Sequence, residues 1–133
     1  CEYAKEMGAK RALMLPVSAP FHCAMLKGAG EKLGKELENV EIHDMQIPVI
    51  TNVTADYIKS KDDIKRLLVE QVSNSVLWED SIRKMISDGV DTFIEVGPGK
   101  ALSGFVRKIS RDVNIFNVED MASLEKTLAG LGK

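Results

Sequence analysis

The sequence contains little cysteine, few aromatic residues and no excess of positive charge, and each shortage excludes a class of protein. Cys1 and Cys23 are the two cysteines among 133 residues. They form neither a disulfide framework nor a zinc site, so we expect a reducing, cytoplasmic environment. Lysines and acidic residues are interspersed and the formal net charge is −2. Because nucleic-acid binding usually requires a basic patch, no nucleic-acid partner is predicted.

Long apolar runs are missing as well. No run approaches the roughly 18 residues that cross a bilayer, so no membrane association is predicted. The opening Cys1–Glu6 is polar and has no signal-peptide character. The chain does not begin with methionine and starts inside a helical pattern, from which we expect a piece of a longer protein.

Several catalytic motifs are also absent. No serine lies in a Gly-x-Ser-x-Gly nucleophile elbow; Ser103 is the nearest approach. The run Gly97-Pro98-Gly99-Lys100 lacks the flanking residues of a P-loop and the third glycine of a dinucleotide fingerprint. The two histidines, His22 and His43, are too few and too scattered for a metal site. No metal and no cofactor are therefore predicted.

The apolar pattern predicts one soluble α/β domain. Hydrophobic residues make up 44% and charged residues 29% of the sequence, as in globular proteins. Three- and four-residue spacing predicts helices, and β-rich runs bounded by turn residues predict strands. The helices are expected over 2–8, 26–40, 60–72, 78–86, 102–109 and 121–131, and the strands over 11–15, 47–53, 92–96 and 113–118. Strands separated by helices predict a largely parallel sheet.

The segment Leu15–Cys23 is the first candidate site. It ends an apolar run, contains two prolines and places His22 just before a long helix. Histidine titrates near neutrality, which suits a general base on a connecting loop. A purely structural histidine is the alternative, and His43 is interpreted as a solvated loop residue. Gly97-Pro98-Gly99 either forms a tight turn or presents backbone N–H groups to an anion.

Three motifs resemble, in order and spacing, those of one enzyme family. They read LPVSAPFHC at 15–23, QVSNSVLW at 71–78 and EVGPGKAL at 95–102. Together they are similar to the C-terminal portion of malonyl-CoA:acyl carrier protein transacylase of bacterial type II fatty-acid synthesis. The resemblance implies an α/β-hydrolase-like acyltransferase domain with an inserted ferredoxin-like subdomain. Residues 1–16 would end that subdomain and 17–133 would form the C-terminal part of the large domain.

The resemblance also implies a chemistry. Malonyl would move from coenzyme A to the phosphopantetheine thiol of acyl carrier protein through a serine ester, without metal or redox cofactor. His22 would be the general base, and the backbone carbonyl of Gln71 would orient it. Phe21, next to the base, would bind substrate and favour malonyl over its α-methyl analogue; simple hydrophobic packing is the alternative.

The family's nucleophilic serine lies in an earlier part that this sequence does not contain. We therefore expect this polypeptide to be inactive alone and to self-associate through an exposed sheet edge. Two alternatives stay open: a fragment of a polyketide synthase acyltransferase domain, and a non-catalytic remnant that binds carrier protein. A terminal helix followed by Gly130–Lys133 favours the stand-alone enzyme over the synthase domain.

Overall fold

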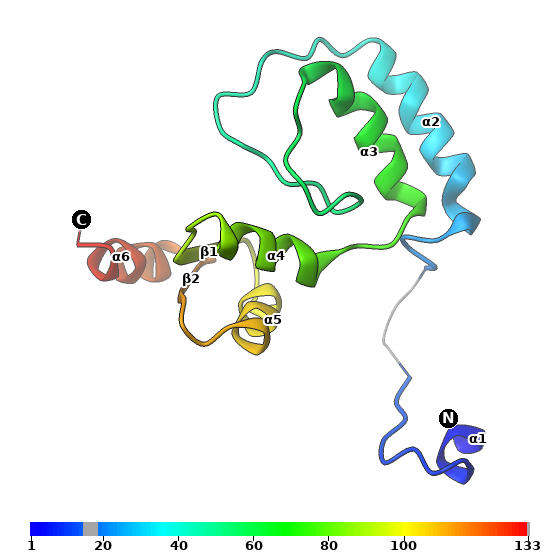
Figure 1. Ribbon diagram of the computed structural model, residues 1–133, viewed down its shortest axis with the longest axis vertical. Helices are drawn as coiled ribbons and strands as arrows, with labels where there is room; N and C mark the ends of the chain where they lie inside the picture. The colour runs from blue at the N-terminus through cyan, green and yellow to red at the C-terminus, as the bar shows by residue number, and fades with distance from the viewer. Residues whose placement is uncertain (15–18, 133) are drawn as a thin grey trace.

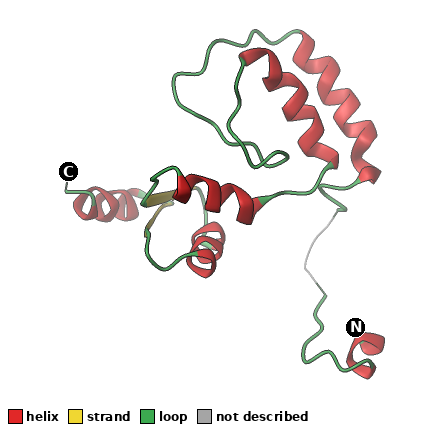
Figure 2. Ribbon diagram, in the orientation of Figure 1, coloured by secondary structure: helices red, strands yellow, loops and turns green. Residues whose placement is uncertain are grey.

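A parallel βαβ unit forms the sheet of the protein. The computed structural model describes residues 1–14 and 19–132. Strands β1 (Thr92–Val96) and β2 (Asn114–Val118) pair in parallel from Thr92 opposite Asn114 to Val96 opposite Val118, and α5 (Ala101–Ile109) connects them. Helix α6 (Met121–Gly130) packs on β2, and α4 (Trp78–Ser87) packs on α5 (Figures 1 and 2). The predicted α/β class with a parallel sheet is confirmed.

Two helices pack side by side to form the second part of the molecule (Figure 1). They are α2 (Lys27–Glu38), which follows the 3₁₀ turn η1 (Ala24–Leu26), and α3 (Ile64–Ser73), which follows η2 (Lys61–Asp63). A Cβ atom added at Gly30 would lie 3.3 Å from the Val69 carbonyl oxygen, and one at Gly34 would lie 3.5 Å from a Val69 methyl. These glycines weaken the helix intrinsically but let α2 approach α3 closely.

Glycines in the left-handed conformation follow two of the helices. Gly8 follows the short helix α1 (Glu2–Glu6) with φ +92°, and Gly89 follows α4 with φ +94°. At the first site the Ala9 N–H donates to the Ala4 carbonyl (2.9 Å) and the Gly8 N–H donates to the Lys5 carbonyl (2.9 Å). This pair of hydrogen bonds is a Schellman motif, which needs a residue with left-handed backbone angles at the glycine position.

Two predicted strands are wrong in the part of the chain that the structure describes. Residues 11–14 have no regular secondary structure, and Leu15 lies outside the described residues. The run 47–53 makes only a single antiparallel bridge, between Ile50 and Tyr57. A strand exists only where a neighbour satisfies its backbone N–H and C=O groups, and apolar β-rich sequence does not supply that neighbour. The helix expected over 26–40 ends at Glu38 and begins as the η1 turn.

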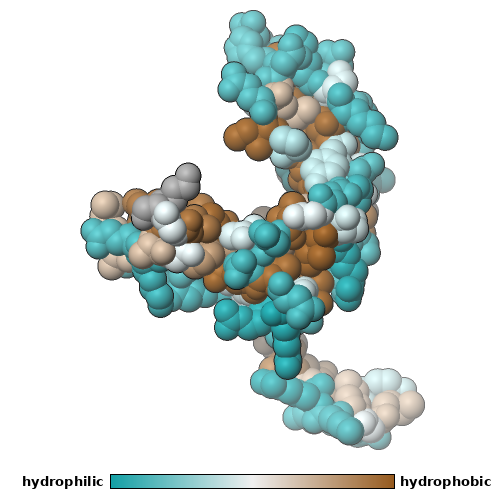
Figure 3. All heavy atoms as spheres, turned by 60° about the vertical axis from the view of Figure 1, so that its left-hand side comes forward, coloured by the Kyte–Doolittle hydropathy of each residue, from teal (hydrophilic) through white to brown (hydrophobic). Residues whose placement is uncertain are grey.

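The chain exposes far more surface than a compact protein of its mass. Its accessible surface is 10,245 Å², whereas a compact monomer of 14.7 kDa exposes about 6,900 Å². Within the described residues the buried hydrophobic side chains are Leu67, Ile82 and Val106. Apolar surface lies open in the centre of the face drawn in Figure 3. Large exposed apolar side chains include Phe21, Met25, Ile47, Ile94, Val96 and Phe105.

Candidate functional site

His22 and Gln71 meet although 49 positions separate them in the sequence. The Nδ1 atom of His22 lies 2.8 Å from the Gln71 carbonyl oxygen. A carbonyl can only accept, so Nδ1 carries the proton in this contact and Nε2 of a neutral ring keeps its lone pair. The backbone of His22 is left-handed, with φ +57°, a conformation uncommon for a non-glycine residue. Such a residue is held by its surroundings, and strained residues of this kind cluster at functional sites.

The end of α3 explains why the Gln71 carbonyl is available. The last four carbonyls of an α-helix have no intrahelical partner, and α3 ends at Ser73. Gln71 belongs to this group, and its carbonyl lies at the negative end of the helix dipole, which attracts a positive ring. The Gln71 side-chain oxygen accepts from Asn52 Nδ2 (3.4 Å). Helix α3 therefore supplies both an acceptor and a fixed direction for the His22 ring.

The residues around His22 form a tight turn before η1. The Phe21 N–H donates to the Ala19 carbonyl (3.0 Å), and the Cys23 thiol donates to the Pro20 carbonyl (3.1 Å). The Phe21 side chain is 63% exposed. It therefore fills no core position among the described residues. The first four residues of the Leu15–Cys23 motif lie outside the described residues.

The Gly97-Pro98-Gly99 segment is a turn whose neighbouring N–H groups already have acceptors. Glu95, on β1, accepts from the Leu102 N–H (3.1 Å) and the Ser103 N–H (2.7 Å) at the start of α5. The Ser103 hydroxyl, then the Ser103 and Leu102 backbone N–H groups, lower the pKa of Glu95 despite its partial desolvation. A carboxylate of the protein itself thus takes the place that a bound anion would occupy, and the structure favours the turn over the anion site.

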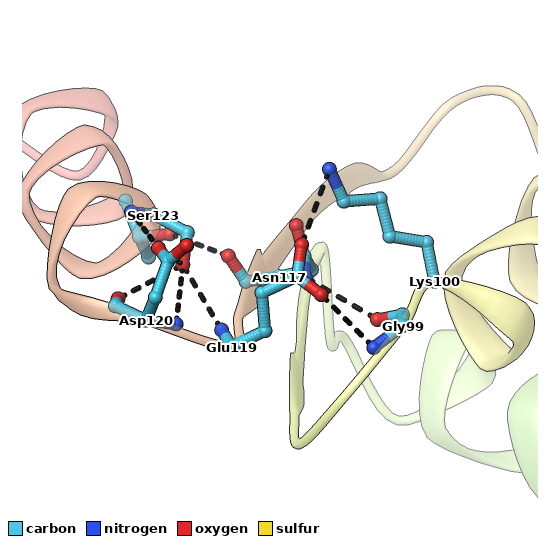
Figure 4. Close-up of polar contacts among 7 residues, drawn as sticks. Gly99, Lys100, Asn117, Glu119, Asp120 and Ser123 are labelled. Carbon is cyan, nitrogen blue, oxygen red and sulfur yellow. Dashed lines mark hydrogen bonds and ion pairs between the residues drawn. The ribbon is translucent and has the colours of Figure 1, made fainter.

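A second carboxylate, on the residue that follows β2, holds the same turn (Figure 4). The Gly99 N–H donates to Glu119 Oε2 (3.0 Å), and Lys100 Nζ lies 3.6 Å from Glu119 Oε1. The Asn117 side chain donates to the Gly99 carbonyl (3.3 Å). The glycines supply the backbone angles, with φ +140° at Gly97 and +86° at Gly99. The turn therefore joins the carboxyl ends of both strands.

His43 and a cleft lined by basic side chains are further polar features of the surface. His43 is exposed and lies 3.9 Å from Glu41. An open cleft of about 750 Å³ is lined by the basic side chains Arg107, Lys108 and Arg111. Among the residues that the structure describes, no three His, Cys, Asp or Glu side chains are grouped to hold a metal ion. In the same part of the chain, no helix has the length and apolar character needed to traverse a membrane.

Curated relatives match nearly the whole chain. The malonyl CoA-acyl carrier protein transacylase of Bacillus subtilis is 48% identical over 130 residues, which cover 98% of this chain and 41% of the relative. The protein of the same name from Haemophilus influenzae is 44% identical over 119 residues, 90% of this chain and 38% of the relative. This chain thus spans about two fifths of the length of these relatives. No protein-family model matches it.

Solved structures of transacylases also match nearly the whole chain. The malonyl CoA-acyl carrier protein transacylase from Clostridium perfringens superposes with a TM-score of 0.89 at 53% identity, over 98% of this chain and 41% of that one. A malonyl-transacylase in complex with a type II polyketide acyl-carrier protein superposes with a TM-score of 0.88 at 38% identity, over 97% of this chain and 42% of that one.

The parallel sheet and its covering helices are therefore those of part of an α/β acyltransferase domain. More narrowly, the chain corresponds in sequence and in fold to the C-terminal portion of malonyl CoA-acyl carrier protein transacylases, and the resemblance seen in its three motifs is confirmed.

Sequence reasoning missed the acidic residues that hold the Gly-Pro-Gly turn and the amides beside Gln71. Glu95 stands two residues before Gly97 and Glu119 stands immediately after β2, and these positions are the only local signal they carry. Asn52 lies near the end of the β-rich run 47–53 and Asn74 follows the last residue of a helix, positions where asparagine commonly bonds to nearby backbone. Local signals of this type do not say which distant carbonyl or carboxylate is reached.

Proposed function

We propose that this chain supplies the histidine part of a malonyl transacylase active site. The complete enzyme would move malonyl from coenzyme A to the phosphopantetheine thiol of acyl carrier protein in fatty-acid biosynthesis. The observation that carries the proposal is the 2.8 Å contact between His22 Nδ1 and the Gln71 carbonyl. It leaves Nε2 as the basic nitrogen, in a chain 48% identical to a transacylase.

In the first half-reaction His22 Nε2 accepts the proton of the serine hydroxyl that the earlier part of the domain provides. The serine oxygen attacks the thioester carbonyl, the carbon–sulfur bond breaks, and His22 returns the proton to the coenzyme A sulfur. In the second half, Nε2 takes the proton of the phosphopantetheine thiol. The thiolate attacks the carbonyl of the malonyl-serine ester, the bond between this carbon and the serine oxygen breaks, and His22 returns the proton to the serine oxygen. No metal or redox cofactor takes part.

Gln71 and Phe21 have separate roles in this proposal. The Gln71 carbonyl holds the ring in one tautomer and orientation through both half-reactions. The exposed Phe21 ring borders the space next to His22, where an α-methyl group on the acyl chain would be crowded. Phe21 is thus proposed to select malonyl, and packing against the rest of the domain is the alternative for this side chain.

The surface of the chain supports a role as one part of a larger domain. It exposes about 3,300 Å² more than a compact monomer of its mass. A standard stable interface takes only about 800 Å² from each partner. We propose that the earlier part of a transacylase covers this excess. Without it, the open edge of the two-stranded sheet would pair with a second copy of the chain, so self-association is expected.

The remaining assignments follow from the same proposal. The chain would form the C-terminal part of the large domain over 17–133, with residues 1–16 ending the small ferredoxin-like subdomain; the separate position of α1 in Figure 1 supports that division. Both substrates carry phosphate, and the cleft with Arg107, Lys108 and Arg111 offers positive charge for it. The enzyme would act in the cytoplasm.

Two observations favour alternative functions. A neighbour solved with a type II polyketide carrier protein favours polyketide carriers as a second acceptor class. The lack of a Gly-x-Ser-x-Gly elbow in the sequence favours a non-catalytic, carrier-binding remnant if no complementary chain exists.

A malonyl transfer assay tests the proposal. The chain is measured alone and mixed with the N-terminal portion of a transacylase, using labelled malonyl-CoA and holo acyl carrier protein. We expect transfer only in the mixture, and a loss of about 10²- to 10⁴-fold in His22→Ala, the usual contribution of a general base. His43→Ala, which removes an exposed imidazole, is the matched control and should keep full activity. Equal activity of the two variants would refute the role of His22.

A further inference from the structure

Asn74 is the first residue after α3, and its side chain bonds to the backbone carbonyl next to the one that His22 uses. Asn74 Nδ2 donates to the Glu70 carbonyl oxygen over 2.6 Å. In a continuing α-helix the backbone N–H of residue 74 would bond to this same carbonyl, four residues back. The side-chain amide therefore replaces a helical hydrogen bond at the point where the helix stops.

The backbone of Asn74 decides what happens to the next carbonyl. Its angles are extended, with φ −114° and ψ 156°, so the chain leaves the helix axis at this residue. Because residue 75 no longer lies above the last turn, its N–H cannot reach the Gln71 carbonyl as it would in a longer helix. The Glu70 carbonyl is occupied by Asn74, and the Gln71 carbonyl, one residue later, receives His22.

The side chain of Gln71 is held separately. Asn52 Nδ2 donates to Gln71 Oε1 (3.4 Å), and the Asn52 carbonyl accepts from the Leu77 N–H (2.8 Å). Asn52 thus links Gln71, in the last turn of α3, to Leu77, which stands at the far end of the connecting segment 74–77. This tie limits how far the segment can move if the Asn74 amide is lost, so a substitution at Asn74 should disturb the helix end without unfolding it.

We propose that Asn74 is a positioning residue of the transfer reaction: it ends α3 so that the Gln71 carbonyl, and no other, orients His22. This inference rests on the proposed function for its kinetic consequence, but the ring orientation can be measured without any activity. Without the Asn74 donor, the Glu70 and Gln71 carbonyls become competing acceptors at a frayed helix end. The His22 ring then loses its single partner and its single tautomer.

The first test is NMR on the 133-residue chain, using the ¹⁵N shifts of the His22 ring nitrogens at a pH where the ring is neutral. Asn74→Asp keeps the size and shape of the side chain but removes its N–H donor when ionised. We expect the wild type to show Nδ1–H with unprotonated Nε2, and Asn74→Asp to show a mixture of tautomers. Asn74→Gln retains an amide donor and should keep most of the wild-type pattern. Asn39→Asp is the matched control, since Asn39 is the residue that follows α2.

The second test is the kinetics of the same variants in complex with the N-terminal portion. We expect Asn74→Asp to lower kcat by about 10- to 100-fold, as small misplacements of catalytic groups do, with little change in KM for malonyl-CoA. A wild-type tautomer pattern and kcat in Asn74→Asp would overturn the inference. A changed tautomer in a complex that never transfers malonyl would retain the positioning role and refute the proposed function instead.

Discussion

The packing of α2 on α3 should be disturbed by a larger side chain at Gly30 but not by one at Gly28. A Cβ at Gly30 would lie 3.3 Å from the Val69 carbonyl oxygen, 3.6 Å from a Val69 methyl and 3.7 Å from Val72 Cβ. A Cβ at Gly28 meets no atom within 4 Å among the described residues. The two glycines share one helix, so the same substitution at each separates packing from helix propensity.

Gly30→Val adds two further methyl groups where even a Cβ is tight. We expect it to destabilise the chain by about 1–3 kcal/mol through overpacking. Gly28→Val should be neutral or stabilising by a few tenths of a kcal/mol, because valine is a better helix former than glycine. The measurement is urea unfolding of both variants followed by circular dichroism. Since α2 begins just after His22 and α3 carries Gln71, Gly30→Val should also weaken transfer activity in the complex with the N-terminal portion.

Equal free energies of unfolding for Gly28→Val and Gly30→Val would refute this reasoning. They would mean that α2 and α3 do not approach at Gly30 in solution. A loss of stability in both variants would point instead to the β-branched side chain as the cause.

Three further predictions concern other parts of the chain. A Cβ at Gly130 would lie 2.5 Å from Phe116 Cε1, so Gly130→Ala should cost about 1–3 kcal/mol in urea unfolding. Gly104→Ala, where no described atom lies within 4 Å, should gain up to about 1 kcal/mol; the opposite order would contradict the packing of α6 on β2. The pKa of Glu95 is lowered from 4.5 by the Ser103 hydroxyl and the adjoining backbone N–H groups, so its contribution to stability is present above that pH and is lost as the pH falls through the lowered pKa. Glu95→Gln should therefore reduce the loss of stability at acid pH in a plot of unfolding midpoint against pH, and an unchanged loss would argue against the Glu95 contacts with the Leu102 and Ser103 N–H groups. Phe21→Ser, in the complex with the N-terminal portion, should raise methylmalonyl use relative to malonyl by a factor worth about 1–3 kcal/mol; an unchanged ratio would assign Phe21 to packing.

Local patterns predicted most of the helices because the causes of helix formation are local, whereas the strands depended on their neighbours. Apolar spacing located α3, α4, α5 and α6, and the left-handed glycines Gly8 and Gly89 marked two helix ends. The runs 92–96 and 113–118 became β1 and β2 because each had the other as a neighbour. The run 47–53 has similar β-rich character but makes only the bridge from Ile50 to Tyr57, since pairing depends on what lies beside a segment.

The candidate site also combines features set by local sequence with features set by tertiary packing. The sequence by itself determined the family resemblance, the candidate base His22 and the position of Gln71 near a helix end, because motifs and periodicity are properties of neighbouring residues. Only the tertiary structure decided that these two residues meet, across 49 positions, and that Glu95 and Glu119 occupy the N–H groups of the Gly-Pro-Gly turn. Such contacts arise from the packing of α2 on α3 and of α5 on the sheet, and hydrogen bonds between distant residues form only after that packing has brought donor and acceptor within about 3 Å.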